Sequence, residues 1–304
     1  REAEDGQILQ EGICETGAMA SFMAAGTAYA NHGLPMIPFY IFYSMFGLQR
    51  VGDMIWACGD MLCKGFLLGG TSGRTTLNGE GVQHQDGHSH LLAATVPNLC
   101  SFDPAFGYEI ALIVRDGIRR MYAAQEDVFY YLTVTNQPYA MPAMPEGVET
   151  GVLAGMYCFE READARINLF GSGAIMTEVR EAAQLLRARG HAVNIFSVTS
   201  YNELVREALA AERRSLHAPS GADEPYVRRL LGAERGVFIA ASDYMKQMGD
   251  MVSRWIPGRF VPLGTDGFGL SDTREALRRH FEVDAENVAL AALDALCHEG
   301  KLTA

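Results

Sequence analysis

The segment INLFGSGAIMTEVREAAQLLRARGHAVNIFSV, residues 167–198, decides the fold class of this 304-residue chain. It opens with a short apolar run, Ile167–Phe170, turns at glycines, continues through Thr177–Ala188 and closes with a second apolar run, Ala192–Val198. Apolar residues in the central stretch recur with helical spacing, whereas both flanking runs have the length and composition of buried strands. A strand, a helix and a strand in this order predict two parallel strands joined by a crossover helix.

The same alternation continues on both sides of this segment. Toward the C-terminus the patterns predict strands at Gly236–Ala241 and Phe260–Leu263, and helices at Tyr244–Trp255, Arg274–His280 and Val288–Cys297. Toward the N-terminus they predict helices at Gly17–Ala30, Gln49–Cys63 and Phe106–Gln125, a helix or turn at Leu91–Cys100, a buried strand at Met36–Tyr43 and a strand at Val128–Val134. The predicted fold class is therefore α/β, with mostly parallel sheets flanked by helices.

Three prolines, Pro138, Pro142 and Pro145, mark a joint between two units. Because proline interrupts regular helix, we expect NQPYAMPAMPEG, residues 136–147, to be an extended linker. A chain of 304 residues is also close to two domains of ~150 residues each. We therefore expect one domain over residues 1–147 and a second over residues 148–304.

Charge and cysteine content exclude several classes of partner. The chain has 25 Lys and Arg against 37 Asp and Glu, a net charge of −12, which repels nucleic-acid phosphates and anionic lipid surfaces. We therefore expect no nucleic-acid or membrane partner. The cysteines form no C-x-x-C pair, which is typical of reduced thiols and favours a cytoplasmic location. They are Cys14, Cys58, Cys63, Cys100, Cys158 and Cys297.

One stretch without charged residues, Thr16–Gln49, could be mistaken for a membrane helix. Asn31, Gly33 and two prolines interrupt it before it reaches the ~18 consecutive apolar residues that a span requires. No membrane span is therefore expected. The chain opens on Arg1 without a basic and apolar leader, so we interpret this end as processed or trimmed.

A polar loop, GEGVQHQDGHSH over residues 79–90, contains three of the eight histidines. Histidine and carboxylate side chains bind metals, so His84, His88 and His90 form a candidate metal site. Alternatively, His84 and Glu80 bind or protonate a substrate, because imidazole titrates near neutral pH. The third interpretation is a solvated surface loop, and spacing alone leaves all three open.

Two further segments have candidate functional residues. Glu15 lies just before a helix of small residues, where a carboxylate either complements the positive end of the helix or serves a site in apolar surroundings. The aromatic run Phe39–Phe46 is either a core strand or the edge of a ligand site, with Tyr43 and Arg50 at its C-terminal end. The turn GSGAIM, residues 171–176, lacks the third glycine of a dinucleotide-binding motif, so we interpret it as a short connection.

Four segments together resemble one enzyme family. EGICETGAM (residues 11–19), IPFYIFYSMFGLQRVGD (37–53), GGTSGRTTLNGEGVQHQDGHSH (69–90) and LGTDGFGLSDTREALRRHFEVD (263–284) closely resemble the homodimeric, bacterial type of pyruvate dehydrogenase. This is the thiamine-diphosphate-dependent decarboxylating component of a multienzyme complex, and the resemblance runs from about Gly6 to the C-terminus. It implies an N-terminally incomplete pyrimidine-binding domain of the transketolase type over residues 1–147, followed by a transketolase-like C-terminal domain.

The resemblance also implies roles for individual residues around the cofactor. Glu15 matches the glutamate that hydrogen-bonds the aminopyrimidine ring of thiamine diphosphate, and Phe46 matches the ring that stacks on it. Tyr43 matches a hydroxyl-bearing residue near cofactor and substrate, and Ile13 is the fourth expected cofactor contact.

For the substrate, the resemblance implies that His84, with Glu80 nearby, binds the 2-oxo acid or manages protons during acetyl transfer. Arg50 is expected to support this substrate pocket by its charge. The expected catalytic residues are therefore Glu15, Tyr43 and His84.

The remaining expectations concern cofactors and partners. The GDG…N signature that holds Mg²⁺ and the diphosphate in such enzymes does not occur in this chain, so no metal ligand is assigned to it. We expect those ligands on a second copy or a complementary chain, with a lipoyl acyltransferase as a further partner and the isolated chain inactive. Two rival functions stay open: a metal-dependent hydrolase that uses the histidine loop, and a non-catalytic dimerisation or assembly module.

Overall fold

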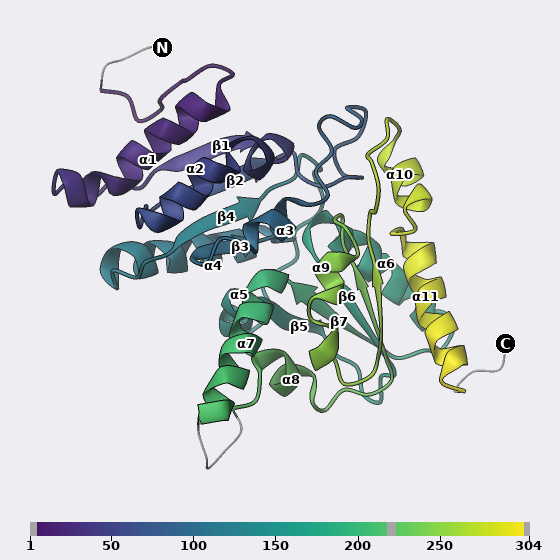
Figure 1. Cartoon of the computed structure of the whole chain (residues 1–304). Coiled ribbons are helices and arrows are strands. Elements are labelled where there is room, and N and C mark those ends of the chain that lie inside the picture. Colours follow the sequence, from purple (N-terminus) through teal and green to yellow (C-terminus); the bar gives the residue numbers. More distant parts are fainter. Residues whose placement is uncertain (1–4, 218–222, 301–304) are drawn as a thin grey trace.

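Two mostly parallel β-sheets, each flanked by helices, form the part of the chain that the computed structural model describes, residues 5–217 and 223–300 (Figure 1). The first sheet has the order β1-β2-β4-β3 and is parallel throughout. Its strands are β1 (Phe39–Tyr43), β2 (Phe66–Gly70), β3 (Leu99–Phe102) and β4 (Phe129–Thr133). Its helices are α1 (Glu15–Asn31), α2 (Leu48–Asp60), α3 (Ser89–Ala93) and α4 (Gly107–Ile118), with short helical turns at Ser44–Phe46 and Arg119–Ala123.

The second sheet has the order β5-β7-β6-β8-β9, and only the edge strand β5 is antiparallel. Its strands are β5 (Met156–Glu160), β6 (Ile167–Gly171), β7 (Val193–Val198), β8 (Val237–Ala241) and β9 (Arg259–Leu263). Its helices are α5 (Glu149–Ala154), α6 (Met176–Arg187), α7 (Tyr201–His217), α8 (Tyr226–Leu231), α9 (Gln247–Asp250), α10 (Arg274–His280) and α11 (Ala285–His298), with short turns at Gly173–Ile175 and Ser253–Trp255.

Each face of the second sheet has its own apolar core. Aliphatic strand residues such as Ile167 and Ile195 pack against α6 and α11 on one face. Aromatic strand residues such as Phe170, Phe196 and Phe238 pack with residues of α7 and α8 on the other. Burial on both faces explains why these strands are continuous apolar runs rather than alternating ones. The predicted α/β fold class is confirmed.

Tertiary structure overrides the sequence prediction in three elements. The strand at β1 is half exposed rather than buried, because it lies at the sheet edge and pairs only with β2; Ile41 is 69% exposed. The segment predicted as a helix over Tyr244–Trp255 forms only α9 and a short turn, since Met245 and Tyr244 form backbone hydrogen bonds with distant loops. The segment Leu91–Cys100 ends in β3, a four-residue strand that we did not predict.

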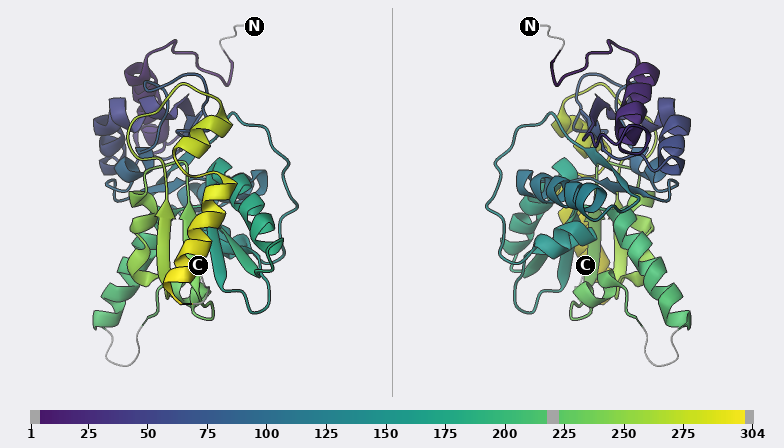
Figure 2. Two further views of the ribbon diagram at one scale, coloured as in Figure 1. Left: turned by 90° about the vertical axis from the view of Figure 1, so that its right-hand side faces the viewer. Right: turned by 90° about the vertical axis from the view of Figure 1, so that its left-hand side faces the viewer.

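The proline-rich segment between the sheets contains neither helix nor strand, as expected. It runs as an extended connection along one side of the molecule (teal in Figure 2). Tyr139 donates a hydrogen bond to the carbonyl of Ala105, and Arg278 of α10 donates to Gln137 Oε1 at 2.6 Å. This linker is therefore held against both units. In the described residues we find no helix with the length and apolarity needed to cross a membrane.

The carboxyl ends of strands from both sheets meet at the junction between the units. Asp103 follows β3 and Thr133 ends β4, while Ser172 follows β6 and Thr199 follows β7. Thr133 Oγ1 donates to Asp103 Oδ1 at 2.7 Å, and the Asp103 amide donates to the Thr199 carbonyl at 2.8 Å. Ligands of open α/β sheets bind beyond the carboxyl ends of strands. Candidate sites are therefore expected along these edges of the two sheets.

Candidate active site

Three rings meet beyond the carboxyl ends of β1 and β2. Tyr43 ends β1 and Phe46 lies in the turn that follows, while His84 belongs to the loop after β2. The His84 ring centre lies 5.0 Å from that of Phe46 and 5.4 Å from that of Tyr43, both in edge-to-face geometry. Tyr43 is 47% exposed, so this ring cluster has an open side. The structure brings together residues that are about 40 positions apart in the sequence.

Glu15 and Arg50 form an ion pair beside these rings. Glu15 begins α1, where its charge complements the positive helix end. The Arg50 Nη1 donates to Glu15 Oε1 at 3.0 Å, and its guanidinium lies 4.0 Å from the centre of the Phe46 ring. The Tyr40 hydroxyl donates to the backbone carbonyl of Glu15 at 3.3 Å, which ties α1 to β1.

The residues just before Glu15 do not give it apolar surroundings, although the Glu15 side chain is only 19% exposed. Ile13 is 99% exposed and Cys14 is also exposed, because both precede α1 at the molecular surface. The neighbour that contacts the Glu15 carboxylate is the Arg50 guanidinium, a cation. Ile13 is therefore not brought into the cluster of Tyr43, Phe46 and His84.

Glu80 pairs with His84 within one turn of the loop. The His84 Nδ1 lies 3.5 Å from Glu80 Oε2, and the two side chains are 25% and 47% exposed. At this distance the two groups are neighbours but form no hydrogen bond, because His84 Nδ1 has no hydrogen-bond partner among the described residues. This geometry agrees with the interpretation that His84 and Glu80 act as a pair.

The second unit holds the loop that contains His84. Both oxygens of the buried Asp243, which follows β8, accept hydrogen bonds from the amides and hydroxyls of Thr75 and Thr76, at 2.5–3.0 Å. Arg74 donates to the carbonyl of Thr265, and the Gln85 Oε1 accepts from the Leu270 amide at 2.7 Å. Ser, Thr and backbone donors around a buried carboxylate make a rigid attachment.

Sequence reasoning did not identify Asp243 as part of the site. One signal was available, since Asp243 lies two residues after the predicted strand Gly236–Ala241 and therefore close to a carboxyl end. The partners Thr75 and Thr76 lie about 170 residues earlier, and no local pattern indicates that contact. Only the docking of the two units creates it.

The three histidines of the loop lie in different surroundings. His84 contacts the rings, and the Nδ1 of His88 lies 3.9 Å from Asp86 Oδ1. His90 is buried and its Nε2 lies 3.0 Å from the Thr133 hydroxyl. Within the described residues, no three His, Cys, Asp or Glu side chains are gathered as metal ligands. The hypothesis of a metal site made of His84, His88 and His90 is therefore wrong.

His90 belongs to a buried hydrogen-bonded chain that ends on Asp103. Thr133 Oγ1 donates to Asp103 Oδ1, so it accepts from a protonated Nε2 of His90. Burial lowers the pKa of His90 to about 4, although the nearby Asp86 acts in the opposite direction. Burial raises the pKa of Asp103 to about 7, against the hydrogen bonds from Thr133 and Ser172.

We expect His90 to make the protein less stable in acid. Unfolded His90 takes up a proton below its ordinary pKa of ~6.5, whereas folded His90 does so only near pH 4. The stability that His90 contributes is therefore lost as the pH falls from about 6.5 to about 4, by about 3 kcal/mol. The measurement is the difference in free energy of unfolding between wild type and His90→Asn from pH 7 to pH 4, by urea titration. A difference that stays constant across this range would contradict the prediction.

The glycine turn after β6 is a short connection, as predicted. Gly171 ends β6, and α6 begins at Met176. Gly173 has a φ of +49°, and a Cβ at this position would lie 2.6 Å from Asp103 Oδ2. The turn therefore packs against a carboxylate of its own chain, which is incompatible with a bound dinucleotide phosphate.

Two mostly parallel sheets flanked by helices, with carboxyl ends of strands from both meeting at their junction, define a transketolase-like fold. A transketolase from Campylobacter jejuni superposes with a TM-score of 0.69 at 19% identity, over 90% of this chain and 38% of that one. Residues 1–142 match the model of the pyruvate dehydrogenase E1 component middle domain, and residues 155–284 match that of the transketolase-like C-terminal domain. The chain belongs to the pyruvate dehydrogenase E1 component family, which confirms the resemblance.

One relative shows that this chain matches part of a longer protein. It is 54% identical to a pyruvate dehydrogenase E1 component of Pseudomonas aeruginosa, over 99% of this chain and 35% of that protein. The chain thus spans about a third of the length of this relative. A split-gene transketolase, described as an inactive β4 tetramer, superposes with a TM-score of 0.62 at 17% identity, over 94% of this chain and 83% of that one.

Proposed function

We propose that this chain supplies the pyrimidine-side half of the active site of a pyruvate dehydrogenase that uses thiamine diphosphate and Mg²⁺, decarboxylates pyruvate and passes acetyl to the lipoyl group of a partner acyltransferase. The observation that carries the proposal is the convergence of Glu15, Tyr43, Phe46 and His84 beyond the carboxyl ends of β1 and β2. Family membership gives these residues their chemical context.

The residues present fit the pyrimidine end of the cofactor. Tyr43 and Phe46 offer partly exposed aromatic faces, and the Glu15 carboxylate retains acceptor capacity beyond its one bond to Arg50. When bound, thiamine diphosphate supplies the electron sink for decarboxylation. Glu15 would hold a proton on the pyrimidine ring, with Tyr43 and Phe46 keeping water from it. Ile13, in the exposed segment before α1, would contact the cofactor once that segment is covered.

The substrate would be bound by His84, Glu80 and Arg50. The His84 ring contacts Tyr43 and Phe46, and a nitrogen of this ring would bind the 2-oxo acid or exchange a proton with it, with Glu80 3.5 Å from Nδ1. Arg50 offers a guanidinium that is 52% exposed and suited to a substrate carboxylate. Asp243 acts indirectly, since it fixes Thr75 and Thr76 at the base of the His84 loop.

The exposed side of the ring cluster supports the proposal that a partner chain covers it. Ile13, Ile41 and Trp56, from the segment before α1, from β1 and from α2, are 99%, 69% and 53% exposed. Large exposed apolar side chains of this kind are common at protein interfaces. We propose that a second copy or a complementary chain covers it and brings the ligands for Mg²⁺ and the diphosphate. All six cysteines are free thiols, which supports a cytoplasmic location.

The test starts from the protein purified from its source. Intact mass measurement identifies every chain present, and the assembly is then titrated with thiamine diphosphate in Mg²⁺ by calorimetry. We expect saturable binding and pyruvate decarboxylation only where a diphosphate-binding portion is present. A complete assembly that binds no thiamine diphosphate would overturn the proposal.

A further inference from the structure

His84 lies in a short turn, residues 81–85, which we call the His84 turn. The amides of His84 and Gln85 both donate to the carbonyl of Gly81, at 3.2 and 3.3 Å. Gly81 has a φ of +79°, a conformation that glycine adopts without steric cost. These two hydrogen bonds close the turn on itself, but they do not fix its direction relative to the sheets. The direction of the His84 turn therefore depends on what the turn packs against.

Both ends of the His84 turn contact one loop of the second unit, residues 264–271. At one end, the side chain of Gln85 is only 1% exposed, and its Oε1 accepts from the Leu270 amide at 2.7 Å. Its Nε2 donates to the Leu77 carbonyl at 2.6 Å. At the other end, a Cβ on Gly81 would overlap the Ser271 hydroxyl. Gln85 thus joins the His84 turn both to the start of its own loop and to the second unit.

A glycine of the second unit allows this close approach. A Cβ added to Gly269 would overlap Gln85 Oε1 and would lie 2.7 Å from Gln85 Cβ. Gly269 does not have a left-handed φ, so alanine is compatible with its backbone conformation. Its replacement by alanine is therefore a selective change, because the added methyl group meets the side chain of Gln85.

The loop over residues 264–271 is itself attached to the second unit beyond the carboxyl end of β8. The Thr265 amide donates to the Tyr244 carbonyl at 2.8 Å, and the Thr265 hydroxyl donates to the Asp243 carbonyl at 2.9 Å. The Lys246 amide donates to Asp266 Oδ1 at 3.0 Å. These bonds make the loop a fixed support for the His84 turn.

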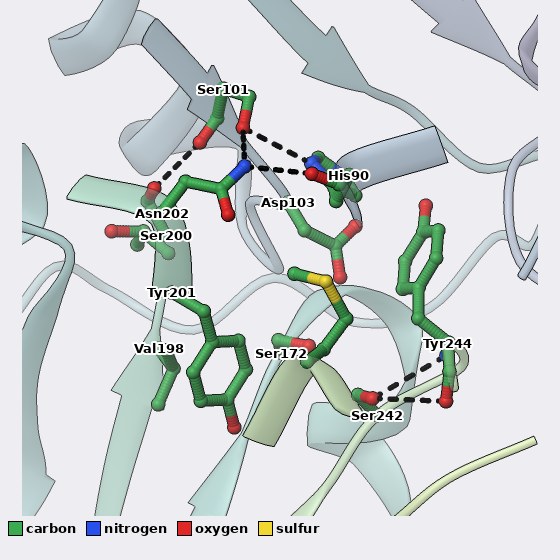
Figure 3. Close-up of a pocket in the computed structure, with 12 residues that line it drawn as sticks. His90, Ser101, Asp103, Ser172, Val198, Ser200, Tyr201, Asn202, Ser242 and Tyr244 are labelled. Atoms are coloured by element: carbon green, nitrogen blue, oxygen red, sulfur yellow. Dashed lines mark hydrogen bonds between the residues drawn. The ribbon is translucent and has the colours of Figure 1, made fainter. Parts of the chain in front are cut away.

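The C-terminal end of the histidine loop is attached to the second unit at a different place, shown in Figure 3. Asn202 of α7 donates through Nδ2 to the His90 carbonyl at 2.9 Å and to Ser101 Oγ at 2.5 Å. Of the hydrogen bonds described here that join the histidine loop to the second unit, the bond of Gln85 lies nearest to His84 in the sequence. Gln85 is thus the residue through which the second unit acts most directly on His84.

We propose that Gln85 is a positioning residue, which orients His84 toward the substrate through its hydrogen bond to the second unit. This proposal rests on the proposed function and gives the second unit a part in the reaction. The His84 ring contacts Tyr43 and Phe46 by ring edges, and its Nδ1 has no hydrogen-bond partner among the described residues. The backbone of the turn therefore sets the position of the ring. A displacement of about 1 Å at a reacting group can lower a rate by about 10²-fold.

A double-mutant cycle on the complete assembly tests the proposal. We expect Gln85→Leu and Gly269→Ala each to lower pyruvate turnover about tenfold or more, with the affinity for thiamine diphosphate in Mg²⁺ unchanged. In a His84→Ala background, neither substitution lowers turnover further, because each acts through His84. The matched control is Gly107→Ala, since a Cβ there meets no atom within 4 Å, and it keeps full turnover. Losses of equal size in both backgrounds would show a general structural role and overturn the proposal.

Hydrogen exchange of the whole chain gives a second measurement, which requires no turnover. In Gly269→Ala we expect the amides of His84 and Gln85 to exchange about tenfold faster. The amides of Thr75 and Thr76, which donate to Asp243, keep their wild-type rates. Unchanged exchange at His84 and Gln85 contradicts the proposal whatever the activity. A wild-type assembly without pyruvate turnover overturns the proposed function, whereas additive losses in a working assembly overturn only the role of Gln85, so the two failures are distinguishable.

Discussion

An assembly with Glu15→Gln loses pyruvate turnover by about 10²-fold or more while its thermal unfolding is nearly unchanged. Glutamine has the same shape and can still accept a hydrogen bond from Arg50, but it cannot hold or release a proton at the carboxylate position. The stability change is small because the ion pair with Arg50 is partly exposed. The measurement is the steady-state rate of decarboxylation, with unfolding followed by circular dichroism.

The matched control for this prediction is Glu11→Gln. Glu11 lies four residues earlier, is exposed, and accepts from the Ser21 hydroxyl, so it undergoes the same chemical change outside the ring cluster. We expect full turnover in this variant. Unchanged turnover in Glu15→Gln would favour the rival hypothesis that the chain is a non-catalytic assembly module.

Replacing Glu109 by Ala destabilises the protein by about 3–5 kcal/mol. Glu109 lies in the first turn of α4 and is completely buried. Its Oε2 accepts from the amides of Ala105 and Phe106 at 2.6 and 3.1 Å, and its Oε1 accepts from the hydroxyls of Tyr157 and Ser197 at 2.7 Å each. The substitution removes the acceptor of four buried donors, of which only Tyr157 has another partner, the Tyr108 hydroxyl, and it removes the hydrogen bonds that link α4 to β5 and β7.

Urea unfolding of Glu109→Ala, Glu109→Gln and Glu181→Ala checks this prediction. Glutamine retains one acceptor oxygen, so we expect an intermediate loss for Glu109→Gln. Glu181 is an exposed residue in the middle of α6, and its replacement by Ala changes stability by about 0.5 kcal/mol or less. A loss below about 1 kcal/mol for Glu109→Ala would mean that the four hydrogen bonds do not hold the units together.

The local sequence was enough to predict most elements and several members of the site. Helical spacing predicted α10 over Arg274–His280 with the bounds that the structure has. The aromatic run predicted a strand, β1, with Tyr43 at its end and Phe46 in the turn that follows; the ligand-binding role of these side chains stays a prediction. These predictions succeed because the period of apolar residues and the chemistry of short motifs depend on neighbouring positions only.

Other features depend on contacts between distant segments. No pattern within residues 79–90 distinguishes His84, which faces the rings, from His90, which is buried against Thr133. The same holds for Asp103, since it follows a strand of four residues that is too short to show a period.

The sequence by itself determined the α/β class, the proline-rich joint and the family, because each depends on the order and identity of residues that are close together in the chain. Only the tertiary structure decided that β1 is an exposed edge strand, that Glu15 pairs with Arg50, and that Asp243 holds the His84 loop. Burial and charge pairing result from the docking of two sheets whose contacting residues are up to about 200 positions apart. A local sequence pattern therefore cannot predict how the two sheets dock.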